Sequence, residues 1–281
     1  MAKGILQKNR VAVVTGAGAG IGAAAAKLFD SRGMNVVAFD KNQEALDKLG
    51  QSLTNDYLLI TGDVTRPEDL QDLLDQTYSQ FGQCNLLFNN AGVGHKAGPW
   101  DSLSKWSSTM LVNFEAIVDL QHLFVPQMLK QESPSAIVNL GSKEGITTPP
   151  GNVAYSVSKA AVKVLTEHLA HELRNTPNHK VSAHLLVPGY TWTPMNFPEA
   201  DFDKPETKPT EPWSPDELMA FFEERFEADD FYIIALDNEV TKEMDTKRMT
   251  WAMGDLIHNR PALSRWHPDY KEKFEAFMDR R

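Results

Sequence analysis

The sequence predicts an α/β fold in which a doubly wound parallel sheet is flanked by helices. Short apolar runs alternate with helical stretches along most of the chain. The runs are apolar throughout rather than at every second residue, which indicates strands buried on both faces. The first run, Val11–Thr15, leads directly into a glycine-rich segment that ends at Gly22. Because crossovers between successive parallel strands are right-handed, the pattern favours a Rossmann-type sheet of about seven strands.

The predicted strands are apolar runs bounded by turn residues or by helical segments. In chain order they are Val11–Thr15, Asn35–Phe39, Tyr57–Ile60, Asn85–Phe88, Ala136–Leu140, Val181–Val187 and Phe231–Leu236.

Helices are predicted between these strands. Gly33 is placed as a C-terminal stop, and Pro67 is in the favoured first turn of its helix. Pro126 should bend the longest helix or mark its last turn. The predicted helices are Gly20 to about Arg32, a polar helix after Asp40, Pro67 to Gly82, roughly Lys105 to Lys130, Asn152 to about Arg174, one that begins at Ser214, and Val240–His258.

The length of 281 residues suits one large domain, so we expect residues 1–281 to form a single dinucleotide-binding catalytic domain. Residues 199–230 contain twelve acids and three bases, and the stretch from Pro194 is rich in proline. We therefore expect residues 194–230 to form a soluble substrate lid. Residues 237–281 should form a C-terminal helical arm, whose aromatic side chains cap the site, contact another subunit or pack in their own core.

Composition excludes several functions. The net charge of −10 argues against nucleic acid or an anionic membrane as the main partner. Cys84 is the only cysteine, so no intrachain disulfide is possible and a reducing compartment fits. Residues 1–10 lack the apolar region of a secretory signal, and no apolar run approaches a membrane span. We expect a cytoplasmic protein.

The glycine segment is a candidate cofactor site. Gly16, Gly20 and Gly22 follow a strand and open a helix, where backbone N–H groups can approach a pyrophosphate, although an ordinary tight turn would look similar. Asp40 ends the next predicted strand and can accept the ribose hydroxyls of NAD, whereas it would repel the 2′-phosphate of NADP. We therefore predict NAD as the cofactor. Asp63 and Val64 either hold the adenine edge or form a loop cap.

Tyr155 and Lys159 are four residues apart, so on a helix they share one face. A phenol beside an ammonium should have a lowered pKa and exchange protons near neutral pH. Without other motifs, this spacing is also explained by a surface aromatic–cation pair on a helix, which is common in proteins.

Six motifs in order over residues 11–193 resemble the short-chain dehydrogenases/reductases, in the subfamily of about 250 residues. They are Thr15–Gly22 (with Ile21 between the last two glycines), Asn89-Asn90-Ala91-Gly92, Asn113, Ser142, Tyr155 to Lys159, and Pro188-Gly189 followed by Thr193. The resemblance implies NAD(P)-dependent interconversion of a secondary alcohol and a ketone. It also implies a small-molecule substrate and a homo-dimer or homo-tetramer, built on the helices around residues 105–130 and 152–174.

The resemblance also implies residue roles. Tyr155 would be the general acid or base, Ser142 would donate a hydrogen bond to the substrate oxygen, and Lys159 would hold the nicotinamide ribose. Asn113 would link Lys159 to solvent through a water. The remaining implied cofactor contacts come from Asn90, Ala91 and Gly92 on the adenosine side, and from Pro188, Gly189, Thr191 and Thr193 at the carboxamide end.

Some positions depart from the family pattern. Thr191 replaces the usual Val or Ile, and Lys143-Glu144 follow Ser142 where small or apolar residues are usual. Lys143 or Glu144 either edges the substrate pocket and favours a polar substrate, or belongs to a surface ion pair. Candidate wall residues by position are His95, Trp100 and Tyr190.

Other functions remain open at this point. An NAD-binding epimerase or dehydratase, or a non-catalytic NAD-sensing regulator, could use the same fold. We expect no metal, because the cluster of Glu167, His168, His171 and Glu172 is better explained as a solvated or interface helix face.

Overall fold

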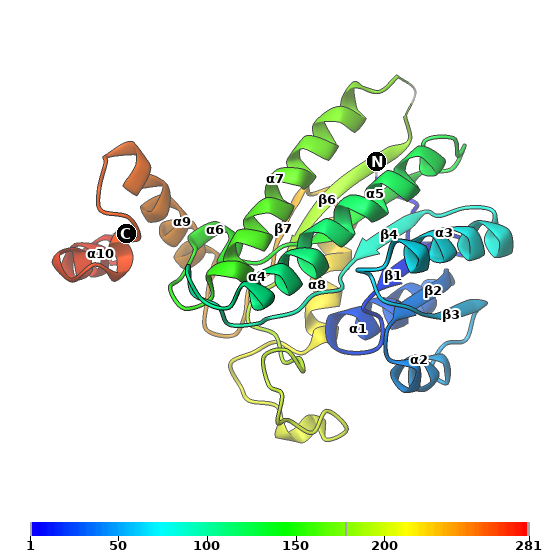
Figure 1. Cartoon of the computed structure of the whole chain (residues 1–281), viewed down its shortest axis with the longest axis horizontal. Coiled ribbons are helices and arrows are strands. Elements are labelled where there is room, and N and C mark those ends of the chain that lie inside the picture. The colour runs from blue at the N-terminus through cyan, green and yellow to red at the C-terminus, as the bar shows by residue number, and fades with distance from the viewer. Residues whose placement is uncertain (1, 178, 280–281) are drawn as a thin grey trace.

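The computed structural model describes residues 2–177 and 179–279, and within them seven parallel strands form one sheet (Figure 1). The strand order is β3-β2-β1-β4-β5-β6-β7. The order reverses between β1 and β4, which is the switch point where α/β sheets bind ligands. The strands are β1 (Val11–Thr15), β2 (Asn35–Asp40), β3 (Tyr57–Thr61), β4 (Leu86–Asn89), β5 (Ser135–Leu140), β6 (Val181–Val187) and β7 (Tyr232–Ile234). The predicted Rossmann-type fold is confirmed.

Helices cover both faces of this sheet. Side chains of α1, α2 and α8 pack on one face, whereas those of α3, α5 and α7 pack on the other. The bounds are α1 (Gly20–Ser31), α2 (Gln43–Gly50), α3 (Pro67–Phe81), α4 (Leu103–Met110), α5 (Ala116–Met128), α6 (Glu144–Thr147), α7 (Val153–Asn175), α8 (Pro215–Glu227), α9 (Lys242–Ile257) and α10 (Lys271–Met278).

Successive residues of β1 enter opposite cores, which explains why this strand is apolar throughout. Ala12 and Val14 face α1 and α8, while Val11 and Val13 face α3 and α5. All four side chains are fully buried. The absence of period-two alternation in the sequence therefore has a direct structural cause.

The longest predicted helix is interrupted by a π-helical turn. Between α4 and α5 lies η1, Leu111–Glu115, in which Asn113 is fully buried. Pro126 lies in the last turn of α5, as predicted. The seventh strand is shorter than predicted, Tyr232–Ile234 instead of 231–236, although the Ala235 N–H still donates to the Val187 carbonyl at 2.9 Å.

The segment expected to be a lid has two parts. Residues 194–213 form a loop with one short 3₁₀ turn, η2 (Pro205–Thr207), whereas α8 packs against α1 with Leu218, Phe222 and Phe226 buried. Since α8 is part of the core, only residues 194–213 could move without unpacking it.

The C-terminal arm, residues 241–279, contains α9, two 3₁₀ turns and α10, and Figure 1 shows α9 and α10 extending away from the sheet. The 3₁₀ turns are η3 (Ser264–Trp266) and η4 (Pro268–Tyr270). Trp251 packs against Phe274 and Phe277 and lies under the guanidinium of Arg260. Residues 280 and 281 of the predicted arm, and residue 1 of the predicted domain, lie outside the described residues. No helix among the described residues is both long enough and apolar enough to cross a membrane.

Candidate active site

One cavity of about 690 Å³ lies at the carboxyl ends of the strands, where most of the predicted site residues meet. Its walls come from the loops after β1, β4, β5 and β6, together with Asp40 at the end of β2 and side chains of α7 and α9. The predicted residues that line it are Gly16, Gly20, Ile21, Asp40, Asn90, Ala91, Gly92, Ser142, Tyr155, Lys159, Pro188, Gly189, Thr191 and Thr193. Four predicted residues do not line it: Gly22, Asp63, Val64 and Asn113.

The glycine turn is held by hydrogen bonds from the loop after β4. The Asn90 side-chain amide donates to the carbonyls of Thr15 and Gly16, both at 3.0 Å. Gly16 has a φ of 66°, a conformation that favours glycine. A Cβ on Gly22 would overlap the Gly16 carbonyl oxygen, so Gly22 allows α1 to begin directly against the turn. Although Gly22 does not line the cavity, it fixes the shape of the wall.

Asp40 lies beside this turn at the end of β2. Its carboxylate accepts hydrogen bonds from the Gly18 N–H and the Asn42 N–H, both at 2.9 Å. These backbone bonds fix the orientation of the carboxylate at the edge of the cavity. The glycine turn, the start of α1 and an oriented carboxylate together fit the pyrophosphate and ribose of a dinucleotide.

Asp63 is engaged within its own loop. One carboxylate oxygen accepts from both the N–H and the hydroxyl of Thr65, at 2.9 and 2.8 Å, which is the loop-cap arrangement. These bonds lower the pKa of Asp63. Val64 is buried in the core beside α3.

Tyr155 and Lys159 lie on the first turns of α7, with Lys159 Nζ 5.8 Å from the centre of the Tyr155 ring. Nζ donates to the Leu140 carbonyl at 2.7 Å, which ties α7 to the end of β5. Lys159 is 3% exposed, and burial lowers its pKa to about 8.

The expected lowering of the Tyr155 pKa is not found. Burial raises the pKa of this phenol to about 12, a hydrogen bond with Ser142 opposes the rise, and the Glu144 carboxylate adds to it. Removal of the phenol from water disfavours the phenolate more than its polar neighbours stabilise it. Sequence spacing could place the lysine nearby but could not show this desolvation.

Asn113 lies behind the cavity wall, where the π-turn holds its side chain. The side-chain carbonyl accepts from the Val93 N–H at 2.8 Å, and the amide donates to the Val93 carbonyl at 3.0 Å and to Ser158 Oγ at 3.1 Å. Ser158 Oγ in turn donates to the Tyr155 carbonyl. Asn113 therefore connects the loop after β4 to the helix that carries Tyr155. Sequence reasoning missed Ser158, although it lies inside the motif from Tyr155 to Lys159.

Lys143 and Glu144 both line the cavity, but they do not pair with each other. Lys143 forms ion pairs with Asp245 and Asp237, whereas burial raises the pKa of Glu144 and the charge of Lys96 opposes this rise. Of the three candidate wall residues, Tyr190 lines the cavity, whereas His95 and Trp100 are exposed and do not.

Several cavity residues carried no sequence signal, namely Lys96, Asn152, Met195, Asp237, Val240 and Arg248. The last four lie beyond residues 11–193, where the sequence offered no motif to place them. Among the described residues, no group of three or more His, Cys, Asp or Glu side chains could hold a metal ion.

Comparisons with known proteins agree with this site. The family model "short chain dehydrogenase" matches residues 10–203. The "CLA biosynthesis dehydrogenase/reductase" of Lactiplantibacillus plantarum is 30% identical over 210 residues, which cover 73% of each chain. The "3-oxoacyl-[acyl-carrier-protein] reductase FabG" of Thermotoga maritima is 32% identical over 195 residues, covering 67% of this chain and 76% of that protein.

Solved structures extend the likeness beyond residue 203. A short-chain dehydrogenase/reductase from Burkholderia phymatum in complex with NAD has a TM-score of 0.79 and 29% identity, and the match covers 91% of this chain and 96% of that one. A metagenomic short-chain oxidoreductase in complex with NADP has a TM-score of 0.68 and 26% identity, covering 82% and 98%. The chain is therefore a member of the short-chain dehydrogenase/reductase family, an oxidoreductase that acts on CH–OH groups.

Proposed function

We propose that this protein interconverts a secondary alcohol and a ketone with NAD, and that Tyr155 is the acid/base. One observation carries the proposal: Tyr155, Ser142 and Lys159 line the same cavity as the glycine turn and Asp40. A proton-transfer group, a hydrogen-bond donor and a cation therefore line one cavity that also fits a dinucleotide.

Each of these residues has a distinct role in the proposal. Ser142 donates a hydrogen bond to the substrate oxygen, and Tyr155 gives that oxygen its proton in reduction or removes it in oxidation. Lys159, held by the Leu140 carbonyl, adds positive charge beside the phenol and holds the nicotinamide ribose. Asn113 positions the start of α7 and, through a water molecule, relays protons between Lys159 and solvent. A bound nicotinamide supplies the hydride donor or acceptor.

The acid/base role is tested with Tyr155→Phe. This variant removes only the phenol oxygen, so it should lose on the order of 100-fold or more in kcat for oxidation of secondary alcohols. Its Kd for NADH, measured by fluorescence, should match wild type. Turnover close to wild type across a panel of alcohols, sugars, steroids and hydroxy acids would remove Tyr155 from the mechanism.

NAD is the proposed cofactor because the Asp40 carboxylate, fixed by the Gly18 and Asn42 amides, would meet the 2′-phosphate of NADP with like charge. Wild type should bind NADH more tightly than NADPH in fluorescence titrations. Asp40→Ala should bring the Kd values of the two cofactors closer together. Tighter binding of NADPH by wild type would contradict this assignment. Asp63 and Val64 remain proposed adenine contacts, although the bonds to Thr65 account for one Asp63 oxygen.

The proposal also covers the lid, the oligomeric state and the cellular location of the protein. Residues 194–213 are the proposed lid, since this segment is a loop whose first residues, Pro194, Met195 and Asn196, line the cavity. A homo-dimer or homo-tetramer is proposed from exposed apolar side chains such as Val164 on α7 and Leu129, which directly follows α5. A cytoplasmic location is proposed because the one cysteine is unpaired and buried.

A further inference from the structure

The C-terminal arm contributes to the cavity although it extends away from the sheet. Arg248 on α9, and Val240 just before the helix, line the same space as Ser142 and Tyr155. Figure 1 shows α9 reaching this end of the sheet beside α6, and α6 directly follows Ser142 and Lys143. One end of the cavity is therefore built by residues outside the segment that matches the family model.

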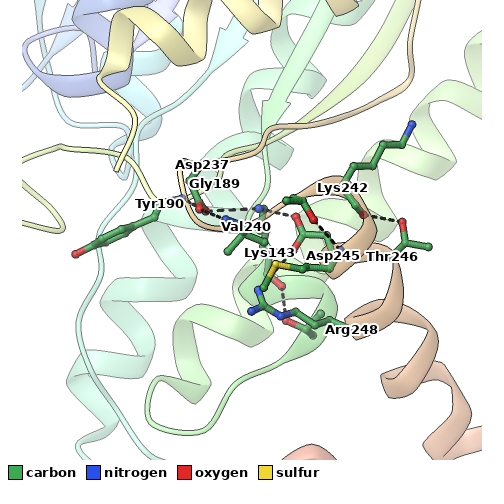
Figure 2. Close-up of polar contacts among 12 residues, drawn as sticks. Lys143, Gly189, Tyr190, Asp237, Val240, Lys242, Asp245, Thr246 and Arg248 are labelled. Atoms are coloured by element: carbon green, nitrogen blue, oxygen red, sulfur yellow. Dashed lines mark hydrogen bonds and ion pairs between the residues drawn. The ribbon is translucent and has the colours of Figure 1, made fainter. Parts of the chain in front are cut away.

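Ion pairs fix α9 in this position (Figure 2). Lys143 Nζ is 2.6 Å from Asp245 Oδ2 and 3.8 Å from Asp237 Oδ2, and both aspartate side chains are less than 10% exposed. Asp237 also accepts hydrogen bonds from the Val240 N–H at 2.7 Å and from the Tyr190 N–H at 3.2 Å. Lys143 and Asp237 thus join the loops after β5 and β6 to the start of the arm.

These ion pairs leave a hydrogen-bond donor of the Arg248 guanidinium without a partner among the described residues. Arg248 forms an ion pair with Asp245, but Nη1 and Oδ1 are 3.8 Å apart, which is too long for a hydrogen bond. The other Asp245 oxygen is already paired with Lys143. Arg248 Nε is shielded from solvent and has no hydrogen-bond partner among the described residues, and the whole side chain is 22% exposed.

The other charges at this end are balanced. Lys143 pairs with two aspartates, and the charge of Lys96 opposes the rise in the Glu144 pKa. Among the described residues, the acid paired with Arg248 is one that it shares with Lys143, and the charge of Arg248 also acts against that of Arg265. A partly buried cation whose ion pair is long is costly, and a ligand carboxylate would satisfy the planar donor fork of arginine with two hydrogen bonds. A phosphate dianion fits less well, because Glu144 lines the same cavity.

We propose that Arg248 binds a carboxylate on the substrate, so that the enzyme acts on hydroxy acids and the corresponding keto acids. This inference rests on the proposed function. Tyr155 and Ser142 engage the oxygen that reacts, Arg248 holds the acid group at the other end, and Lys143 is a positioning residue that acts through Asp245.

The test compares three acids with their methyl esters, which differ mainly in the negative charge: lactate, 3-hydroxybutyrate and mandelate. Wild type should oxidise at least one acid with a kcat/KM tenfold or more above that of its ester. In Arg248→Gln, kcat/KM for the acid should fall by on the order of 100-fold, mostly through a higher KM. The kcat/KM for the ester should stay within about twofold of the wild-type value. Arg248→Lys should recover part of the loss, because it restores the charge without the planar fork.

Two controls accompany these variants. Lys242→Gln removes the same charge from an exposed position on α9 and should leave the ratio of acid to ester unchanged. Calorimetric titration of each acid and ester into the enzyme–NADH complex measures binding without turnover. Acid binding should weaken in Arg248→Gln, while the Kd of NADH stays at the wild-type value.

Failure of this inference can be distinguished from failure of the proposed function. Wild type that oxidises the esters but prefers no acid, or an Arg248→Gln variant that loses acid and ester equally, overturns the carboxylate site and leaves the proposed function in place. Acids that bind in an Arg248-dependent way without being oxidised overturn the proposed function and leave the carboxylate site. Absence of acid binding by either measurement overturns the inference.

Discussion

Two buried groups on one face of α7 have pKa values displaced towards their neutral forms. Burial raises the pKa of Tyr155 to about 12 and lowers that of Lys159 to about 8. Charge on either group is therefore costly in this cavity. The hydrogen bond with Ser142 favours a negative charge on Tyr155, and Lys159 Nζ lies 5.8 Å from the centre of the ring. The Glu144 carboxylate adds to the effect of burial, which is the main cause of the raised Tyr155 pKa.

The Lys159 shift has a measurable effect on stability. Between pH 8 and the ordinary value of 10.5, the unfolded chain retains this proton and the folded chain has released it, so stability rises with pH across that window. Relative to Lys159→Met, wild type should gain on the order of 1 kcal/mol in unfolding free energy between pH 7 and pH 9. Urea unfolding of both proteins at the two pH values measures the difference. Equal pH dependence in the two proteins would show that burial does not displace this pKa.

At the scale of residues, the sequence predicted which side chains lie together. It did not predict how far they are buried or which charges surround them. The four-residue spacing placed Tyr155 and Lys159 on one face, as the structure has them. It could not supply the desolvation of the phenol, nor the charge of Glu144, because both depend on how the loop after β5 folds against α7. Arg248 was missed for a similar reason, since ion pairs between distant segments bring it to the cavity.

At the scale of elements, the strands could be predicted because burial on both faces leaves a continuous apolar run. The π-turn η1 could not be predicted, because one additional residue in a helical turn has no distinctive composition. Its effect is nonetheless specific. It holds Asn113 where one side chain bonds both the N–H and the carbonyl of Val93, and Ser158. π-turns are often found at functional sites, and this one joins two walls of the cavity.

The acidic segment shows how composition can conceal a periodic pattern. Glu199–Asp230 contains many acids, which predicted a lid, yet Leu218, Phe222 and Phe226 recur every four residues and form the buried face of α8. Phe222 packs edge-on against Phe29 and Phe88, which fixes this helix to α1 and β4. The acids lie on the opposite, solvated face. Helical periodicity was therefore the better guide to this part of the segment.

At the scale of the whole molecule, the sheet and the arm differ in how their apolar residues are covered. The two cores beside the sheet are closed by helices on both faces, whereas α9 exposes Met253, Leu256 and Ile257 at 58%, 78% and 69%. Of the long helices, α7 exposes Val157 and Val164, which are seven residues apart and share one face. Exposed apolar side chains aligned along a helix are typical of surfaces that contact another subunit.

The face of α7 that carries Val164 tests the proposed homo-oligomer. A charge at a subunit interface is costly when it is buried without a partner, so Val164→Lys should shift the protein to a lower mass at micromolar concentration. Size-exclusion chromatography with light scattering should give a dimer or tetramer for wild type and a smaller species for the variant. Tyr57→Lys is the control, since Tyr57 is exposed to a similar degree on β3, at the far edge of the sheet. A monomeric wild type would contradict the proposed assembly. An oligomer that is unchanged in Val164→Lys would instead place its interface on another surface, for example the face of α9 that exposes Met253, Leu256 and Ile257.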